Sequence, residues 1–288
     1  MDYEQFVCAM LKCTKKHLSE TEMIERQEIL KNNGVVSVGL VIRDSDKKIA
    51  PIVYMEEFYE KYLMGAEVEE LCRFLMKKVR NVPEMPVCNC GDLQDFQKIS
   101  HQIVYKLINA KMNEKLLREV PSLPILDFAI VFYWMMPSKN EEYGSVLIRN
   151  SNMDFWKLPI SVLYQCAKEN TPKLCPYIFR SLTDYMEEIM GEFVVESPLY
   201  ILSNEMGVNG ASALLYPGMP EIIREKLQQN YYLLPSSIHE FLIVPENEFL
   251  NSEKLRSMVK EVNETHIRRE ELLSDHIYYF DGDIVTKM

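Results

Sequence analysis

Residues 231–244, with the sequence YYLLPSSIHEFLIV, decide the fold of the last third of the chain. Two apolar runs, 231–234 and 241–244, flank the polar segment 235–240. Short apolar runs bounded by proline and serine are typical of buried strands. The pattern predicts two adjacent antiparallel strands joined by a short hairpin, with proline and serine building the turn.

The segments around this hairpin extend the same pattern. The expected elements are, in chain order, strands at 200–203 and 211–216, a helix opened by the Pro-Gly-Met-Pro motif at 217–220, a helix at 252–266, and strands at 276–280 and 284–285. Asp281-Gly282 between the last two strands is a strong hairpin signal. The last third is therefore predicted to be a β-β-α-β-β-α-β module, with antiparallel strands and helices packed on one face of the sheet.

The first two thirds of the sequence also mix helices and strands. The first 33 residues are predicted to be helical, with Ser19 or Thr21 as the N-cap of a second helix that ends at Asn32-Asn33-Gly34. The remaining expectations are strands at 35–42, 49–55, 126–136 and 143–149, helices at 56–63, 67–80 and 113–120, strand or helix at 99–108, and mostly helix at 151–192. The fold class is therefore predicted to be α+β.

Residues 81–92, which contain Pro83, Pro86 and Gly91, are the clearest linker in the sequence. They separate an N-terminal region of helices plus a hairpin, 1–92, from a central strand hairpin and helical segment, 93–195. The α+β module at 196–288 forms the third predicted region. One continuous domain that contains all three regions is the alternative.

Composition excludes several classes of protein. The chain has 288 residues, of which 47% are hydrophobic and 26% are charged, as expected for a globular protein with a core. Its net charge is −11, concentrated in the last third, which disfavours nucleic-acid binding. No apolar segment reaches the ~18 residues of a membrane span. Seven scattered cysteines without a preceding secretory signal predict free thiols and a cytoplasmic location.

Ser237, His239 and Glu240 are the candidate catalytic residues. A nucleophilic serine needs a base at a distance of about 3 Å. Residues two apart on a strand share a face, but their Cβ atoms lie roughly 6.5–7 Å apart, so a hydrogen bond between Ser237 and His239 requires a turn at Ile238. The sequence lacks the Gly-x-Ser-x-Gly motif. A hairpin turn in which the hydroxyls bind backbone amides explains the same residues, and we prefer this interpretation.

Ser236 and Asn263 are candidate ligand-binding residues. Asn263 lies near the end of a predicted helix, where it either caps backbone groups or lines a pocket with His239. No metal or other cofactor is predicted. His266, Asp275 and His276 lack the spacing of a His-Glu-x-x-His site. Cys88-x-Cys90 lacks the second cysteine pair that a zinc site of this kind needs.

Two segments of the sequence resemble a known family. Leu-Pro-Ser-Ser-Ile-His-Glu at 234–240 and Met-Val-Lys-Glu-Val-Asn at 258–263 are similar to an uncharacterised bacterial family of gut anaerobes, domain of unknown function 5688. The resemblance is close over 200–280 and looser over the rest of the chain. It implies an α+β fold and a bacterial cytoplasmic setting, and it implies no activity and no role for any residue.

These patterns favour a non-enzymatic binding or interaction protein over an enzyme. Its partner would be a protein or a small ligand, with no nucleic acid and no membrane, and the sequence leaves its oligomeric state open. The alternative is a hydrolase-type enzyme that uses the Ser237, His239 and Glu240 cluster.

Overall fold

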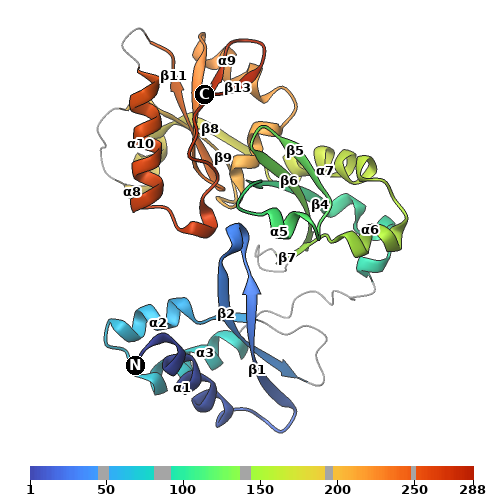
Figure 1. The fold of residues 1–288 in the computed structure, drawn as a ribbon, viewed down its shortest axis with the longest axis vertical. Coiled ribbons are helices and arrows are strands. Elements are labelled where there is room, and N and C mark those ends of the chain that lie inside the picture. The colour runs from blue at the N-terminus through green and yellow to red at the C-terminus, as the bar shows by residue number, and fades with distance from the viewer. Residues whose placement is uncertain (45–51, 81–91, 137–143, 192–196, 248–250) are drawn as a thin grey trace. The chain divides into compact units, whose positions relative to one another are not determined.

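The computed structural model describes residues 1–44, 52–80, 92–136, 144–191, 197–247 and 251–288 (Figure 1). The chain divides into two compact units. The first unit contains Met1–Lys31, Val35–Asp92 and Pro137–Gly144, and the second contains Asn32–Gly34, Leu93–Met136 and Ser145–Met288. The predicted linker at 81–92 lies, except for Asp92, outside the described residues.

The first unit is a layer of helices on a three-stranded antiparallel sheet (Figure 1). The helices are α1 (Tyr3–Lys15), α2 (Glu56–Leu63) and α3 (Val68–Arg80), and the strands are β1 (Glu22–Leu30), β2 (Val36–Asp44) and β3 (Ile52–Tyr54), in the order β1-β2-β3. Alternate strand residues such as Ile24 and Leu40 face Phe6, Phe58 and Leu75 of the helices. The predicted strand at 35–42 and the helices at 56–63 and 67–80 are confirmed.

The predicted second helix, ending at residue 33, is wrong because residues 22–30 form strand β1. Met23, Ile24 and Gln27 fall at helical spacing, but β1 pairs with β2 along its whole length, from Glu22↔Asp44 to Leu30↔Val36. Asn33 and Gly34 have φ angles of 58° and 71°, and positive φ is typical of hairpin turns. The Asn-Gly pair is therefore a hairpin signal, and pairing with β2 outweighs the local helical pattern.

The larger sheet of the second unit has six strands in the order β13-β12-β10-β11-β9-β8. Their bounds are β8 (Tyr177–Ser181), β9 (Tyr200–Asn204), β10 (Tyr231–Ser237), β11 (Glu240–Pro245), β12 (Tyr278–Phe280) and β13 (Val285–Lys287). Every neighbouring pair is antiparallel. The hairpin predicted at 231–244 is confirmed as β10 and β11, and so are the closing hairpin at 276–285 and the α+β fold class.

A four-stranded sheet completes the described β-structure of the second unit. It consists of β4 (Ile103–Asn109), β6 (Phe128–Met136) and β5 (Ser122–Ile125) in the order β4-β6-β5, with β7 (Gly144–Leu147) also paired to β6. Phe128 of β6 contacts rings of the larger sheet, with centroids 6.2 Å from Phe241 and 5.0 Å from Tyr278. Aromatic residues therefore join the two sheets.

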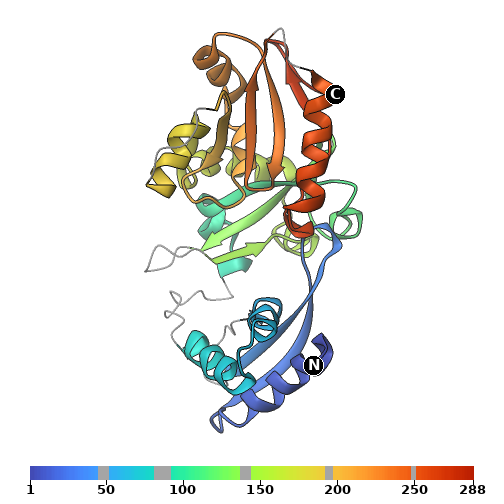
Figure 2. The same ribbon diagram turned by 90° about the vertical axis from the view of Figure 1, so that its left-hand side faces the viewer.

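Helices cover both sheets of the second unit. They are α4 (Phe96–Ile99), α5 (Glu114–Leu117), α6 (Asn150–Trp156), α7 (Ile160–Leu174), α8 (Leu182–Met190), α9 (Met219–Leu227) and α10 (Ser252–Thr265), with 3-10 helices η1 (Asn32–Gly34), η2 (Asp92–Gln94), η3 (Ser100–Gln102), η4 (Gly210–Leu215) and η5 (Arg269–Glu271). Leu255 and Val259 of α10 pack on Leu234 and Val244 of the six-stranded sheet (Figure 2). In the described part of the chain, no helix combines the length and the apolar character that crossing a bilayer requires.

Two further local expectations need correction. The strand expected at 211–216 is the buried 3-10 helix η4, because Ala211, Ser212 and Ala213 are small residues with little preference for a strand. The helical expectation over 151–192 missed β8, which follows Pro176 and pairs with β9. Because β8 and β9 share a sheet, the predicted regions 93–195 and 196–288 come together in the second unit.

Candidate functional site

The tip of the β10–β11 hairpin holds the predicted Ser-Ser-Ile-His-Glu motif. Ser237 pairs with Glu240 across the turn, next to a bulge between Pro235 and Ser237. The Ser237 hydroxyl accepts a hydrogen bond of 3.0 Å from the backbone N–H of His239. The serine therefore closes the turn through its hydroxyl, as the hairpin interpretation predicts.

The His239 ring contacts residues outside the hairpin. Its Nδ1 accepts a hydrogen bond of 3.1 Å from the backbone N–H of Asn209, so the neutral ring carries its proton on Nε2. Nε2 lies 3.8 Å from Oε1 of Glu271, which also pairs with Arg268 at 2.6 Å. The structure thus brings the His239 ring to Glu271, whereas Ser237 Oγ faces the backbone. The catalytic use of Ser237, His239 and Glu240 stays a prediction that this geometry does not favour.

Gly210 lies directly beneath the hairpin turn. A Cβ atom at this position would lie 2.5 Å from the carbonyl oxygen of His239 and 2.7 Å from the backbone nitrogen of Asn204, and closer still to Oγ of Ser203. Ser203 Oγ also donates a hydrogen bond of 2.9 Å to the His239 carbonyl. The close backbone approach explains why glycine occupies this position.

Asn263 binds one backbone group and one carboxylate. Its Nδ2 donates to the Ser274 carbonyl and to Oδ1 of Asp275, both at 2.9 Å, and the residue is buried. It therefore ties α10 to the segment that follows it. Ligand binding by Ser236 and Asn263 stays a prediction.

Asn263 is one of four asparagines that together bind five of the six carbonyls of residues 269–274, here called the clasped segment. Asn33 donates to the carbonyls of Arg269 and Leu272, both at 2.7 Å. The other two donors are Asn32 to Glu270 at 2.8 Å and Asn109 to Leu273 at 2.9 Å. Carbonyl groups that are removed from water need such partners, and the remaining carbonyl of the segment, that of Glu271, accepts a hydrogen bond of 2.8 Å from the backbone N–H of Ile238.

A further asparagine, Asn113, orients Asn33. Asn113 Nδ2 donates to Asn33 Oδ1 at 2.7 Å, and Asn113 Oδ1 accepts from the Asn33 backbone N–H at 2.8 Å. Both residues are almost completely buried. The sequence contained no signal for this group, because Asn33 lies 80 residues from Asn113 and 236 residues from Arg269, and asparagine is common in turns.

A second polar cluster, also missed from the sequence, lies at the end of the clasped segment. Ser274 Oγ donates to Oδ2 of Asp127 at 3.0 Å and accepts from the Tyr278 hydroxyl at 2.8 Å. His276 Nδ1 lies 3.1 Å from Asp127 and 3.3 Å from Ser274. Burial, together with the hydrogen bond to Asp127, raises the pKa of Tyr278 far above its ordinary range.

This cluster holds a serine, a histidine and an aspartate, but not in the arrangement of a catalytic triad. A triad places the serine at one ring nitrogen of histidine and the carboxylate at the other. Here Ser274 and Asp127 both lie at Nδ1 of His276, and Ser274 is 1% exposed. The cluster therefore joins the end of the clasped segment to the turn between β5 and β6.

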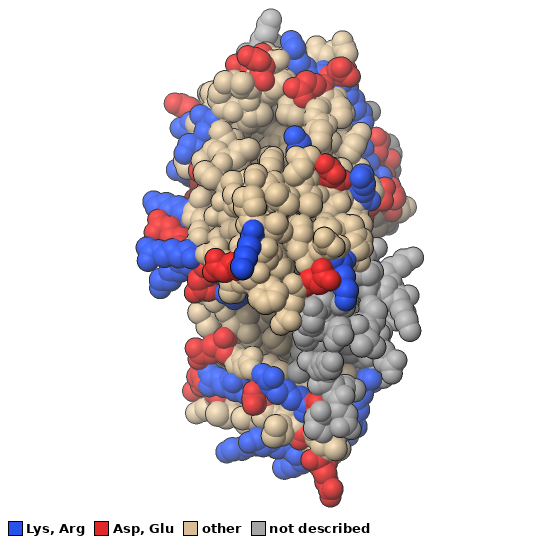
Figure 3. Space-filling view, turned by 90° about the vertical axis from the view of Figure 1, so that its right-hand side faces the viewer, with Lys and Arg blue, Asp and Glu red and all other residues tan. Residues whose placement is uncertain are grey.

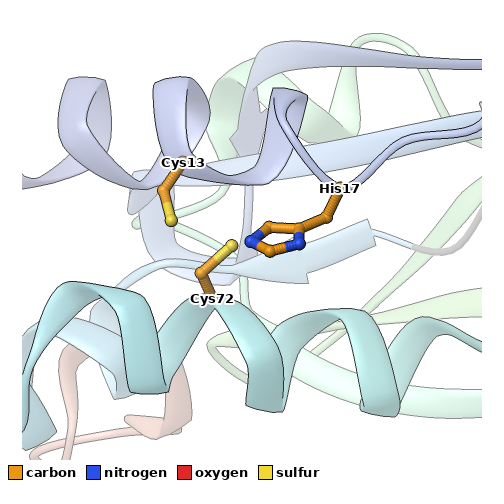
Figure 4. A group of neighbouring side chains, drawn as sticks. All are labelled: Cys13, His17 and Cys72. Atoms are coloured by element: carbon orange, nitrogen blue, oxygen red, sulfur yellow. The ribbon is translucent and has the colours of Figure 1, made fainter.

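Potential metal ligands come together in the first unit. Within the described residues, Cys13, His17 and Cys72 place their ligand atoms within 4.8 Å of one another (Figure 4). The five cysteines of the described residues are free, as expected, and Cys88 and Cys90 lie outside those residues. The sequence alone does not reveal this group, because Cys72 is distant from Cys13 and His17 along the chain.

Substitution of Ser237 by alanine is expected to lower the free energy of unfolding by about 1 kcal/mol, because one turn hydrogen bond is lost. Urea denaturation measures this change, and Ser236→Ala, at a half-buried neighbouring position, is the matched control. If Ser237→Ala instead abolished hydrolysis of an activated ester without changing stability, the hydrolase alternative would be favoured over the turn.

The family of unknown function DUF5688 matches residues 3–282. The chain belongs to this family. The DUF5688 match includes residues of both units. The resemblance expected from the sequence is thus confirmed at the level of the family. Comparisons with curated proteins and with solved structures find no match.

Proposed function

We propose that this protein is a non-enzymatic interaction protein, and that it binds a protein partner through the surface of α6 and the start of α7. The observation that carries the proposal is the exposure of Phe155 and Val162, at 61% and 37%. Met153, Trp156, Leu158 and Ile160 between and beside them are half-buried. We call this set of six residues the α6–α7 surface.

Few charges interrupt the α6–α7 surface. Between residues 150 and 167, Asp154 and Lys157 are the charged positions. Figure 3 shows the resulting broad uncharged area on the face of the second unit that carries these helices. Contiguous exposed apolar surface is costly in water and marks interaction sites, and aromatic residues and methionine are enriched in interface cores.

The surface is held on a packed base. The Trp156 ring lies 5.2 Å from Phe96, and its Nε1 donates to the Leu93 carbonyl at 2.9 Å. Leu163 of α7 is completely buried. A preformed surface loses little conformational entropy on binding. The low charge argues against nucleic acid, which needs clusters of Lys and Arg, and against an anionic membrane surface for the same reason. A protein partner with an apolar binding face is the occupant that fits.

The test starts with a photo-crosslinking amino acid at position 155 in cells that express the protein naturally, followed by identification of the captured protein. Position 74 is the matched control, because Phe74 is an aromatic residue of the first unit that is 45% exposed. The purified partner is then titrated by calorimetry. Phe155→Glu is expected to weaken binding by at least about tenfold, and Phe74→Glu to leave it unchanged.

Three results would contradict the proposal. These are equal capture from positions 155 and 74, unchanged affinity of Phe155→Glu, and binding of the wild-type chain to lipid vesicles that Phe155→Glu abolishes. Thermal unfolding of both variants separates a loss of binding from a loss of folding.

A further inference from the structure

The cysteine–histidine group of the first unit lies between two neighbouring helices. Cys13 is in the last turn of α1, and His17 follows two residues after this helix ends. Cys72 is in the second turn of α3. A spacing of four residues places Cys13 and His17 on the same side of the chain, facing α3 (Figure 4).

The distances suit a bound metal ion. In a tetrahedral zinc site with Zn–S bonds of about 2.3 Å, ligand atoms lie about 3.8 Å apart. The ligand atoms of Cys13, His17 and Cys72 already lie within 4.8 Å of one another without an ion, so rotation of side chains is enough to close the site. Cys72 is completely buried and Cys13 is 5% exposed, whereas His17 is exposed and gives access from solvent.

Neighbouring groups are arranged around the two thiols. Cys13 Sγ donates a hydrogen bond of 3.0 Å to Oε2 of Glu69, and Thr14 Oγ1 lies 3.6 Å from Cys72 Sγ. Burial, Glu69 and Cys72 together raise the pKa of Cys13 to about 12. The hydrogen bond from Cys13, with the charges of Lys16, His17 and Arg73, lowers the pKa of Glu69.

We propose that Cys13, His17 and Cys72 bind a divalent transition-metal ion, and that this ion is zinc. Two sulfur ligands and one imidazole are a combination that favours zinc over magnesium or calcium. On binding, each thiol loses its proton and forms one sulfur–metal bond, a neutral imidazole nitrogen forms the third bond, and nothing is oxidised or reduced. A water molecule would fill the fourth position, because Glu69 contacts Cys13 but is not among the side chains whose ligand atoms lie within 4.8 Å of one another.

Cobalt titration of the full-length, reduced and metal-free chain tests the site. Cobalt(II) is a spectroscopic substitute for zinc, and thiolate ligands give it an intense charge-transfer absorption. We expect one cobalt per chain, displacement by one zinc, and an increase of the melting temperature with zinc. Cys13→Ser and Cys72→Ser should lose the thiolate absorption, and His17→Asn should weaken zinc binding. Cys8→Ser, which removes an exposed cysteine of the same helix, is the matched control and should behave as the wild type.

A measurement of proton release by the wild-type chain does not depend on the variants, which could fail to fold. Zinc binding by the wild-type chain in weakly buffered solution should release protons from the thiols. The proposal is overturned if the wild type shows no thiolate absorption with cobalt, or if Cys13→Ser retains it. It is also overturned if Cys13 and Cys72 form a disulfide in reducing buffer and zinc is not taken up.

Discussion

Alanine at position 210 is expected to lower the free energy of unfolding of the second unit by about 4 kcal/mol. The added methyl group would overlap the His239 carbonyl oxygen and the Asn204 backbone nitrogen, at 2.5 and 2.7 Å. Both atoms belong to paired strands or to the hairpin turn, so relief requires a shift of backbone and the loss of nearby hydrogen bonds. Urea denaturation of Gly210→Ala, followed by tryptophan fluorescence, measures the loss.

Gly39 in the first unit provides the matched control. A Cβ atom there would also lie close to its neighbours, at 2.5 Å from Cγ2 of Ile52 and 2.7 Å from Cδ1 of Ile29. These atoms are the ends of flexible side chains that can rotate away, so Gly39→Ala should cost only about 1 kcal/mol. Equal costs at the two glycines would show that backbone contact does not set the effect at Gly210.

Removal of the Asn33 side chain is the second change for which we expect a large effect. Asn33→Ala should lower the free energy of unfolding by about 3 kcal/mol, because it removes the side-chain donor to the Arg269 and Leu272 carbonyls and the oxygen that accepts a hydrogen bond from the Asn113 amide. Alanine also disfavours the φ angle of 58° at this position. Differential scanning calorimetry and hydrogen exchange of the clasped segment measure the effect.

Asn33→Gly separates the effect of the positive φ angle from the effect of the lost hydrogen bonds. Glycine adopts positive φ without strain, so Asn33→Gly should be about 1 kcal/mol more stable than Asn33→Ala. The loss of stability that remains relative to the wild type is then due to the hydrogen bonds. If Asn33→Gly is as stable as the wild type, the asparagine contacts contribute nothing and the clasped segment is held by other groups. Asn32→Ala, which removes one half-buried hydrogen bond, should cost less than either variant.

The order of apolar and polar residues predicted those strand pairs whose two strands are joined by one short turn. The runs 231–234 and 241–244 lie on either side of one turn, and Asp281-Gly282 joins β12 to β13, so both hairpins could be predicted from the sequence. Strand β1 could not be read in this way. Its residues carry a helical pattern, and β2 alone reveals their pairing. The strand expected at 211–216 was also wrong. Its residues are small, and they form a buried 3-10 helix that packs against the sheet instead of a strand that pairs within it.

In the candidate sites, too, contacts between residues close in sequence could be predicted, and contacts between distant residues could not. The hydroxyl of Ser237 and the backbone of His239 are two residues apart, and the turn between them followed from the sequence. The partners of the His239 ring, Asn209 and Glu271, are separated from it by about 30 residues in either direction along the chain. The side chains of Cys13 and Cys72 meet only because α1 and α3 pack together. Tertiary packing, which no single segment encodes, brings these groups together.

The strand order of the six-stranded sheet has a consequence for folding during synthesis on the ribosome. The described core of the first unit lies between Phe6 and Met76, so it can form early in translation. Strand β10 lies between β11 and β12, and β12 is synthesised some 40 residues after β10 ends. Until Tyr278–Phe280 leaves the exit tunnel, one edge of β10 has no partner and can pair with other nascent chains. We therefore expect the second unit to fold late in synthesis and to depend more strongly on chaperones than the first.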